Sequence, residues 1–187
     1  MSVDYKLYFE FAEDYKIITD KIIGNLVEDF FIQRIFWSND NMEITLGDIT
    51  YNNNVISETI EKFRTMFNGK FRDLTFEFRP KKESLIGFIY LRFEYRKKLS
   101  SMYFTYAFIE NNPKKLLDTL ELVCKHIKPK TIFDPNNIPI TDFPKNFEQL
   151  KKHCKENELI FYYNNGNKID LTDEVKKIIK KYSKNES

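Results

Sequence analysis

Three segments between residues 71 and 110 are so rich in aromatic residues with strand-like patterns that they predict a β-sheet. They read FRDLTFEFRP (71–80), SLIGFIYLRFEYR (84–96) and SMYFTYAFIE (101–110), and short polar runs separate them. Alternation over a few residues is typical of strands, and consecutive strands joined by short turns pair antiparallel. Residues 85–96 are apolar on both faces, which predicts a central strand covered on both sides.

Apolar periodicity elsewhere in the chain switches between the strand and the helix pattern. Asn112 and Pro113 form a typical helix start, and Thr172 is positioned to cap the last helix. The periodicity predicts further strands at 4–11, 42–50 and 159–163, and helices at 13–35, 55–67, 112–126, 145–156 and 173–182.

The order of these elements predicts an α+β fold. We expect an antiparallel β-sheet of about five strands packed by helices, followed by a C-terminal α-β-α extension. Residues 129–144 hold four of the six prolines and show no regular period, so we expect a connector there. Residues 1–128 are then the core domain. Residues 129–187 are the connector plus the extension, packed on the core as one structural domain.

The charge and cysteine content exclude several classes of protein. The chain carries 30 basic and 28 acidic residues, and the two signs are mixed along the sequence. This excludes the strongly basic electrostatic field of a dedicated DNA binder. Two cysteines are too few for a secreted disulfide scaffold and predict reduced thiols in a cytoplasmic protein. No signal peptide and no apolar run of about 18 residues, as a membrane-spanning helix needs, is recognisable. The preference for lysine, asparagine and isoleucine suggests an AT-rich genome.

The cysteines and histidines fall into two pairs, Cys124 with His126 and His153 with Cys154. On a helix, positions 124 and 126 point to nearly opposite sides, and positions 153 and 154 are about 100° apart. Structural zinc sites prefer spacers of two to four residues within a ligand pair. We therefore expect the cysteines to pack inward, the histidines to be solvated, and no metal or cofactor to be bound.

A metal-dependent nuclease site is the enzymatic alternative. Such sites use carboxylates at strand ends, with a nearby lysine, to hold a divalent ion beside a phosphate. Asp48 ends one predicted strand, Glu77 and Arg79 lie on a second, and Glu94 lies on a third. Arginine replaces lysine here and a predicted helix intervenes. Alternating Glu and Arg is also typical of a cross-strand ladder of ion pairs, which is the favoured interpretation.

Residues 86–93, IGFIYLRF, resemble in part the ribonucleoprotein motif of RNA-recognition domains. Gly87, Phe88, Tyr90 and Phe93 stand where that motif has glycine and aromatic residues. The resemblance implies that Phe88 and Tyr90 stack on bases. The predicted order of elements differs, because that fold has two strands between its helices and one is predicted here. Burial of these aromatic side chains under a helix is therefore favoured.

A non-enzymatic, protein-binding role is favoured over catalysis. The chain holds 18 Phe and 11 Tyr but two His, two Cys and five Gly, and it lacks phosphate loops, nucleophile elbows and HExxH helices. We expect a microbial immunity or inhibitor-type protein that blocks another protein stoichiometrically. A nucleic-acid binder or nuclease-like protein that uses the charged sheet face is the alternative. Aromatic and arginine anchors are typical of interfaces. The expected partner-binding residues are Arg92, Arg96, Tyr103, Tyr106, Tyr162 and Tyr163.

Overall fold

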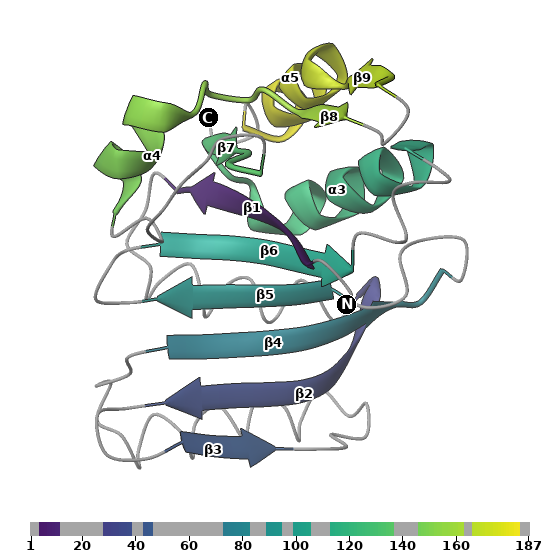
Figure 1. The fold of residues 1–187 in the computed structure, drawn as a ribbon. Coiled ribbons are helices and arrows are strands. Elements are labelled where there is room, and N and C mark those ends of the chain that lie inside the picture. The colour runs from purple at the N-terminus through teal and green to yellow at the C-terminus, as the bar shows by residue number, and fades with distance from the viewer. Residues whose placement is uncertain are drawn as a thin grey trace.

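The protein has the α+β fold that the sequence predicts (Figure 1). The computed structural model describes residues 4–11, 28–38, 43–46, 73–82, 89–94, 99–105, 113–136, 146–162 and 166–183. The strands are β1 Asp4–Glu10, β2 Phe30–Ser38, β3 Glu43–Leu46, β4 Asp73–Pro80, β5 Ile89–Glu94, β6 Leu99–Thr105, β7 Thr131–Phe133, β8 Ile160–Tyr162 and β9 Lys168–Asp170. The helices are α3 Pro113–Ile127, α4 Phe147–His153 and α5 Thr172–Ser183.

The described strands form one large and one small sheet, and every pairing is antiparallel. The large sheet has seven strands in the order β3-β2-β4-β5-β6-β1-β7, two more than expected, and the small sheet pairs β8 with β9. Figure 1 shows the large sheet face-on, with β5 between β4 and β6. The prediction of a central strand within residues 85–96 is confirmed, because β5 is the middle strand of the seven.

Strand β2 corrects the predicted helix over 13–35. Residues 30–38, FFIQRIFWS, form a strand that pairs with β4 along its length, with a register shift between Ile32 and Arg34. Aromatic and β-branched residues favour strands, and pairing with a neighbour overrides a helix-like spacing of the same apolar residues. Residues 13–27 of the predicted helix lie outside the described residues, as does the predicted helix at 55–67.

Strand β7 lies in the proline-rich segment for which no regular structure was expected. It pairs with the edge of β1. Its outer side is covered by Asn157, whose backbone N–H donates to the Ile132 carbonyl at 2.8 Å. The Ile132 N–H donates in turn to Asn157 Oδ1 at 2.9 Å. These two bonds satisfy the edge of the sheet, which would otherwise offer open hydrogen-bonding groups.

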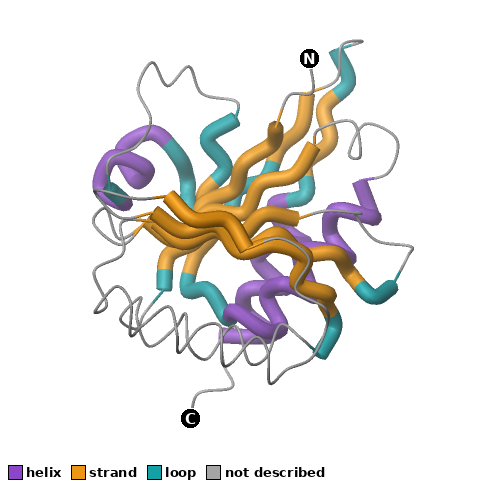
Figure 2. Tube along the Cα trace, turned by 90° about the horizontal axis from the view of Figure 1, so that it is seen from below, coloured by secondary structure: helices purple, strands orange, loops and turns teal. Residues whose placement is uncertain are grey.

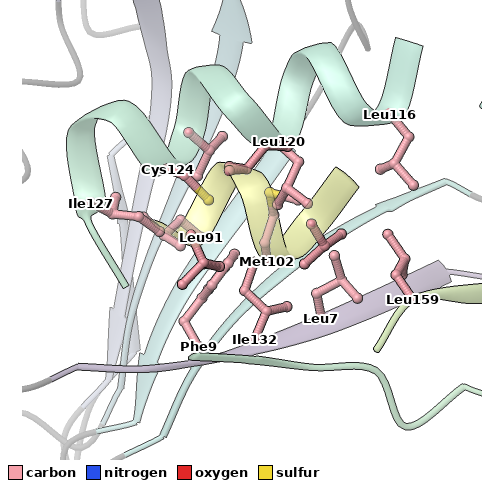
Figure 3. Packing of buried hydrophobic residues seen from close by; sticks show 14 of the residues in the cluster. Leu7, Phe9, Leu91, Met102, Leu116, Leu120, Cys124, Ile127, Ile132 and Leu159 are labelled. Atoms are coloured by element: carbon pink, nitrogen blue, oxygen red, sulfur yellow. The ribbon is translucent and has the colours of Figure 1, made fainter. Parts of the chain in front are cut away.

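The main core lies between one face of the large sheet and the helices α3 and α5. Apolar residues recur every three or four positions along α3, which places them on one stripe facing the sheet. Figure 3 shows this stripe pointing at the strands. The helix contributes Leu116, Leu120, Cys124 and Ile127, and the sheet contributes Leu7, Phe9, Leu91, Met102 and Ile132. Leu159 and Phe161 from the C-terminal segment and Val175 from α5 belong to the same cluster.

A smaller core lies on the opposite face of the sheet, under α4. Successive side chains of a strand point to opposite faces, so Tyr8 points away from its neighbours Leu7 and Phe9. Tyr8 and Phe133 pack there against Leu150 and Cys154. Figure 2 shows helices on both sides of the sheet. At the β1–β7 end the fold therefore has three layers.

The C-terminal extension contains one strand more than predicted. Residues 160–162 and 168–170 form a hairpin between α4 and α5, so the order is α-β-β-α. Strand β9 has the sequence KID, and its single apolar residue gives no alternation that could be recognised. Asn146 caps α4, because its side chain accepts the backbone N–H of Gln149 at 3.1 Å.

The prediction that Thr172 caps the last helix is wrong. Thr172 is the first residue of α5, and its hydroxyl accepts the N–H of Leu159 at 3.2 Å. The Asp170 carboxylate accepts the N–H of Thr172 at 3.1 Å instead. An acidic group at this end is favourable, because the N-terminus of a helix carries partial positive charge. The Thr172 hydroxyl thus ties α5 to the segment before β8.

Candidate functional site

The sheet face opposite the main core carries a row of polar side chains across its central strands. Register pairs Thr75 of β4 with Arg92 of β5, Arg92 with Ser101 of β6, and Ser101 with Tyr8 of β1. Glu94 follows Arg92 by two residues and therefore points to the same face. We call Tyr8, Thr75, Arg92, Glu94 and Ser101 the polar face.

Most of the polar face is buried. Thr75, Glu94 and Ser101 are 9%, 8% and 1% exposed. Arg92 Nη2 lies 3.8 Å from Glu94 Oε1, so the buried carboxylate has a cation beside it. Burial and the nearby Glu94 carboxylate raise the pKa of Tyr8 to about 12, although Arg92 acts in the opposite direction. Tyr8 is therefore a neutral phenol at physiological pH.

The structure does not bring the predicted nuclease residues together. Glu77 lies opposite Tyr90, whereas Glu94 lies opposite Asp73. Measured along the strand direction, Glu77 and Glu94 are thus four residues apart, which is about 13 Å at the usual strand rise. Carboxylates that share metal ions must lie within a few ångströms of each other. Glu77 is 6% exposed and Arg79 is exposed, while Asp48 lies outside the described residues.

The expected partner-binding residues fall on different parts of the fold. Tyr162 lies on β8 of the small sheet and is 55% exposed. Arg92 lies in the large sheet, on the polar face. The backbone of Tyr103 pairs with Tyr90 and with Lys6. Residues 96, 106 and 163 lie outside the described residues.

The two cysteines are buried, as predicted, and they belong to different cores on opposite faces of the sheet. Burial raises the pKa of both thiols, that of Cys154 to about 11, with Asp134 and Glu158 adding to the effect. His153 is exposed, as predicted. The prediction of a solvated His126 is wrong: it is 6% exposed, and its ring packs edge-on against Phe30 with centroids 6.2 Å apart.

His126 belongs to a cluster that the sequence analysis missed. Its Nε2 lies 2.6 Å from Asp29 Oδ2, and donor atoms of Glu28, Asp29 and His126 all lie within 4.8 Å of one another. Lys125 Nζ also contacts Asp29 Oδ2, at 2.9 Å. The partners are 97 residues apart in sequence, and no spacing rule connects them. The local signal was the acidic pair Glu28 and Asp29, which lies inside the segment that was predicted to be helical.

Comparison of the chain with protein-family models, with curated proteins and with solved structures found no match. Within the described ranges, no helix is both long and apolar enough to cross a membrane.

Proposed function

We propose that the protein is a non-enzymatic binding module for another protein, of the immunity or inhibitor type, and that it blocks its partner stoichiometrically. The exposure of Tyr162 is the observation that carries this proposal. Its side chain is 55% exposed on a short hairpin, and it is the large apolar side chain that stands out on the surface of the described residues. Tyrosine is enriched among the residues that dominate binding energies at protein interfaces.

The surroundings of Tyr162 suit a polar rim around an aromatic anchor. Lys168 lies opposite Tyr162 in the hairpin, and its Nζ lies 3.8 Å from Asp170 Oδ2. The side chains of Lys168 and Asp170 are 48% and 51% exposed. Interfaces combine such an anchor with a rim of accessible charges that mainly sets the association rate.

Burial of the carboxylates on the large sheet argues against the nuclease alternative. Glu77 and Glu94 are less than a tenth exposed, and a phosphodiester would have to reach them to be cleaved. The RNA-binding alternative is also weakened, because RNA-recognition domains use a four-stranded sheet and this sheet has seven strands. Of the motif aromatics, Tyr90 is half-buried, and Phe88 lies outside the described residues. Two free buried thiols suit a reducing compartment such as the cytoplasm.

Site-specific photo-crosslinking in the native host tests the proposal. A photoreactive phenylalanine analogue at position 162 should capture one protein of defined mass. The same analogue at Lys114, an exposed residue on α3, is the matched control and should not capture it. The captured protein, once purified, should bind one chain per molecule and lose its activity in proportion.

The substitution Tyr162→Ala should weaken that complex at least about tenfold, mostly through faster dissociation, as loss of an anchor does. Charge reversal at Lys168 should mainly slow association. Equal capture at positions 162 and 114, or capture of a species that nuclease removes, would contradict the proposal.

A further inference from the structure

Three metal-ligating side chains from two distant segments meet at the C-terminal end of α3. Glu28 and Asp29 directly precede β2, and His126 lies in the last turn of the helix. One donor atom from each lies within 4.8 Å of the other two. We propose that this cluster is a divalent-cation site and that Zn²⁺ is the cation its donors suit best. This inference is independent of the proposed function.

The donor set is one imidazole nitrogen and two carboxylate oxygens. Zn²⁺ accepts both kinds of ligand, and three protein ligands plus water are typical of its open sites. Mg²⁺ and Ca²⁺ prefer oxygen ligands throughout, and Mg²⁺ keeps several of its waters. The imidazole therefore favours Zn²⁺ over both.

The cluster is held in place by contacts outside it. The His126 side chain is 4% exposed, and the edge-on contact with Phe30 fixes its ring. The Asp29 carbonyl accepts the N–H of Lys81 at 2.9 Å, which fixes the backbone next to β2. Glu28 is exposed and leaves a route for a cation to enter from solvent. The buried His126 thus makes the site rigid, and the exposed Glu28 keeps the site accessible to a cation from solvent.

The local charge also favours a cation. Two carboxylates lie beside the C-terminal end of α3, which carries partial negative charge. His126 Nε2 and Asp29 Oδ2 lie 2.6 Å apart, so a cation bound between them replaces the proton that they share, and that proton is released to solvent. The positive charge in contact with Asp29 is Lys125, at 2.9 Å.

Lys125 is the natural competitor for a metal ion at Asp29. Its side chain is 48% exposed, so the ammonium can turn into water at little cost when a cation binds. Removing Lys125 should therefore tighten metal binding. This expectation separates the proposed site from adventitious binding elsewhere on the chain.

Calorimetric titration of the full, untagged chain with ZnCl₂ alone, at neutral pH, tests the site. We expect one Zn²⁺ per chain, no comparable heat from MgCl₂, and a higher melting temperature with Zn²⁺ because the ion binds the folded state. Glu28→Gln should weaken binding at least about tenfold, since even changes outside the ligand shell cost that much. His126→Gln should abolish binding, and Lys125→Gln should strengthen it.

His153→Gln and Cys154→Ser are the matched controls and should bind Zn²⁺ like the unmodified chain. Glu28 is exposed, so the Glu28→Gln variant should remain folded, as circular dichroism can show. Its Zn²⁺ affinity therefore tests the site even if His126→Gln unfolds the protein. The proposal is overturned if the chain shows no saturable binding. It is also overturned if Glu28→Gln binds normally, if Lys125→Gln binds more weakly, or if either control loses the ion.

Discussion

The hydroxyl of Tyr5 donates a hydrogen bond to the buried Asp134 carboxylate, across 129 residues of sequence. Tyr5 lies on β1, and Asp134 directly follows β7. The other carboxylate oxygen accepts the backbone N–H of Asn136 at 3.0 Å. The Asn136 side chain closes the network by donating to the carbonyl of Lys6 at 2.8 Å. The start of the chain is thus fastened to the segment after β7 by more than the short strand pairing.

Replacing Tyr5 with phenylalanine should destabilise the fold. Asp134 is 9% exposed, so the carboxylate would lose a donor without gaining water. Leaving a buried acceptor unsatisfied costs about 1–3 kcal/mol. Urea denaturation of Tyr5→Phe should show this loss in the free energy of unfolding. Tyr162→Phe removes a hydroxyl from an exposed ring and is the control, because it should change the free energy of unfolding little. Equal effects of the two substitutions would contradict a stabilising hydrogen bond between Tyr5 and Asp134.

Asp134 should also give the protein a specific dependence on pH. Burial raises the pKa of Asp134 above its ordinary value of 3.8, although hydrogen bonds from Tyr5 and Asn136 oppose the rise. A raised pKa in the folded state means that the folded chain binds the proton more tightly. The stability from this group is fully present below pH 3.8 and is lost as the pH rises through the folded-state pKa.

The measurement compares the original chain with Asp134→Asn between about pH 3 and pH 7. The free energy of unfolding of the original chain, minus that of the variant, should fall as the pH rises. Other acids, such as Glu10 with its lowered pKa, affect both proteins alike and cancel in the difference. A difference that grows with pH would show that Asp134 is instead stabilised in its ionised form.

Much of the fold was predictable because its strongest signals are local. The apolar character of residues 85–96 on both faces predicted the central position of β5, and the stripe on α3 predicted a helix that covers the sheet. The prediction of a helix in place of strand β2 was wrong because Phe30, Phe31 and Ile35 fit a helical stripe as well as a strand. Pairing with β4 is what makes this segment a strand. Strand β7 was missed because it lies in a proline-rich segment without a regular period, and β9 was missed because Ile169 is its single apolar residue.

The candidate site was much less predictable than the fold. Alternation on the strands correctly predicts that Glu77 and Arg79 share a face, but not that Glu77 is buried while Arg79 is exposed. The contact of Asp29 with His126 depends on how α3 lies over the start of β2, which no local pattern encodes. Contacts between distant segments are set by packing, so they could be read only from the structure.

Asn157 protects the edge of the large sheet, and its removal should be costly in two ways. Its side chain accepts the Ile132 N–H at 2.9 Å, and its φ of 57° is a left-handed conformation that asparagine and glycine tolerate better than alanine. Asn157→Ala loses the bond and adds strain, whereas Asn157→Gly loses the bond alone. We expect a loss of about 1 kcal/mol for the glycine variant.

The alanine variant should lose about 1–2 kcal/mol more, the cost of the left-handed conformation. Both variants leave the Ile132 N–H at the edge of β7 without its side-chain acceptor and should self-associate more readily than the original chain, which sedimentation can measure. Equal stability of the two variants would show that the backbone at this position can relax, and an unchanged sedimentation coefficient would show that the edge stays covered.

Two adjacent serines on β6 provide the most direct test of how the two sheet faces are built. Both are buried, at 0% and 1% exposed, but they point to opposite faces. The Ser100 hydroxyl donates to the carbonyl of Phe9 at 2.9 Å. Ser101 Oγ, on the polar face, is buried without a hydrogen-bond partner among the described residues.

The same change at these two positions should therefore have opposite effects on stability. Ser100→Ala loses a hydrogen bond and leaves the Phe9 carbonyl without that donor, at a cost of about 0.5–1.5 kcal/mol. Ser101→Ala removes a hydroxyl whose burial is itself unfavourable, so the free energy of unfolding should stay constant or rise. Urea denaturation of both variants measures the two free energies of unfolding. They are directly comparable, because the same hydroxyl is removed at adjacent positions. A loss at Ser101 as large as that at Ser100 would mean that the polar face gives this hydroxyl a partner in solution.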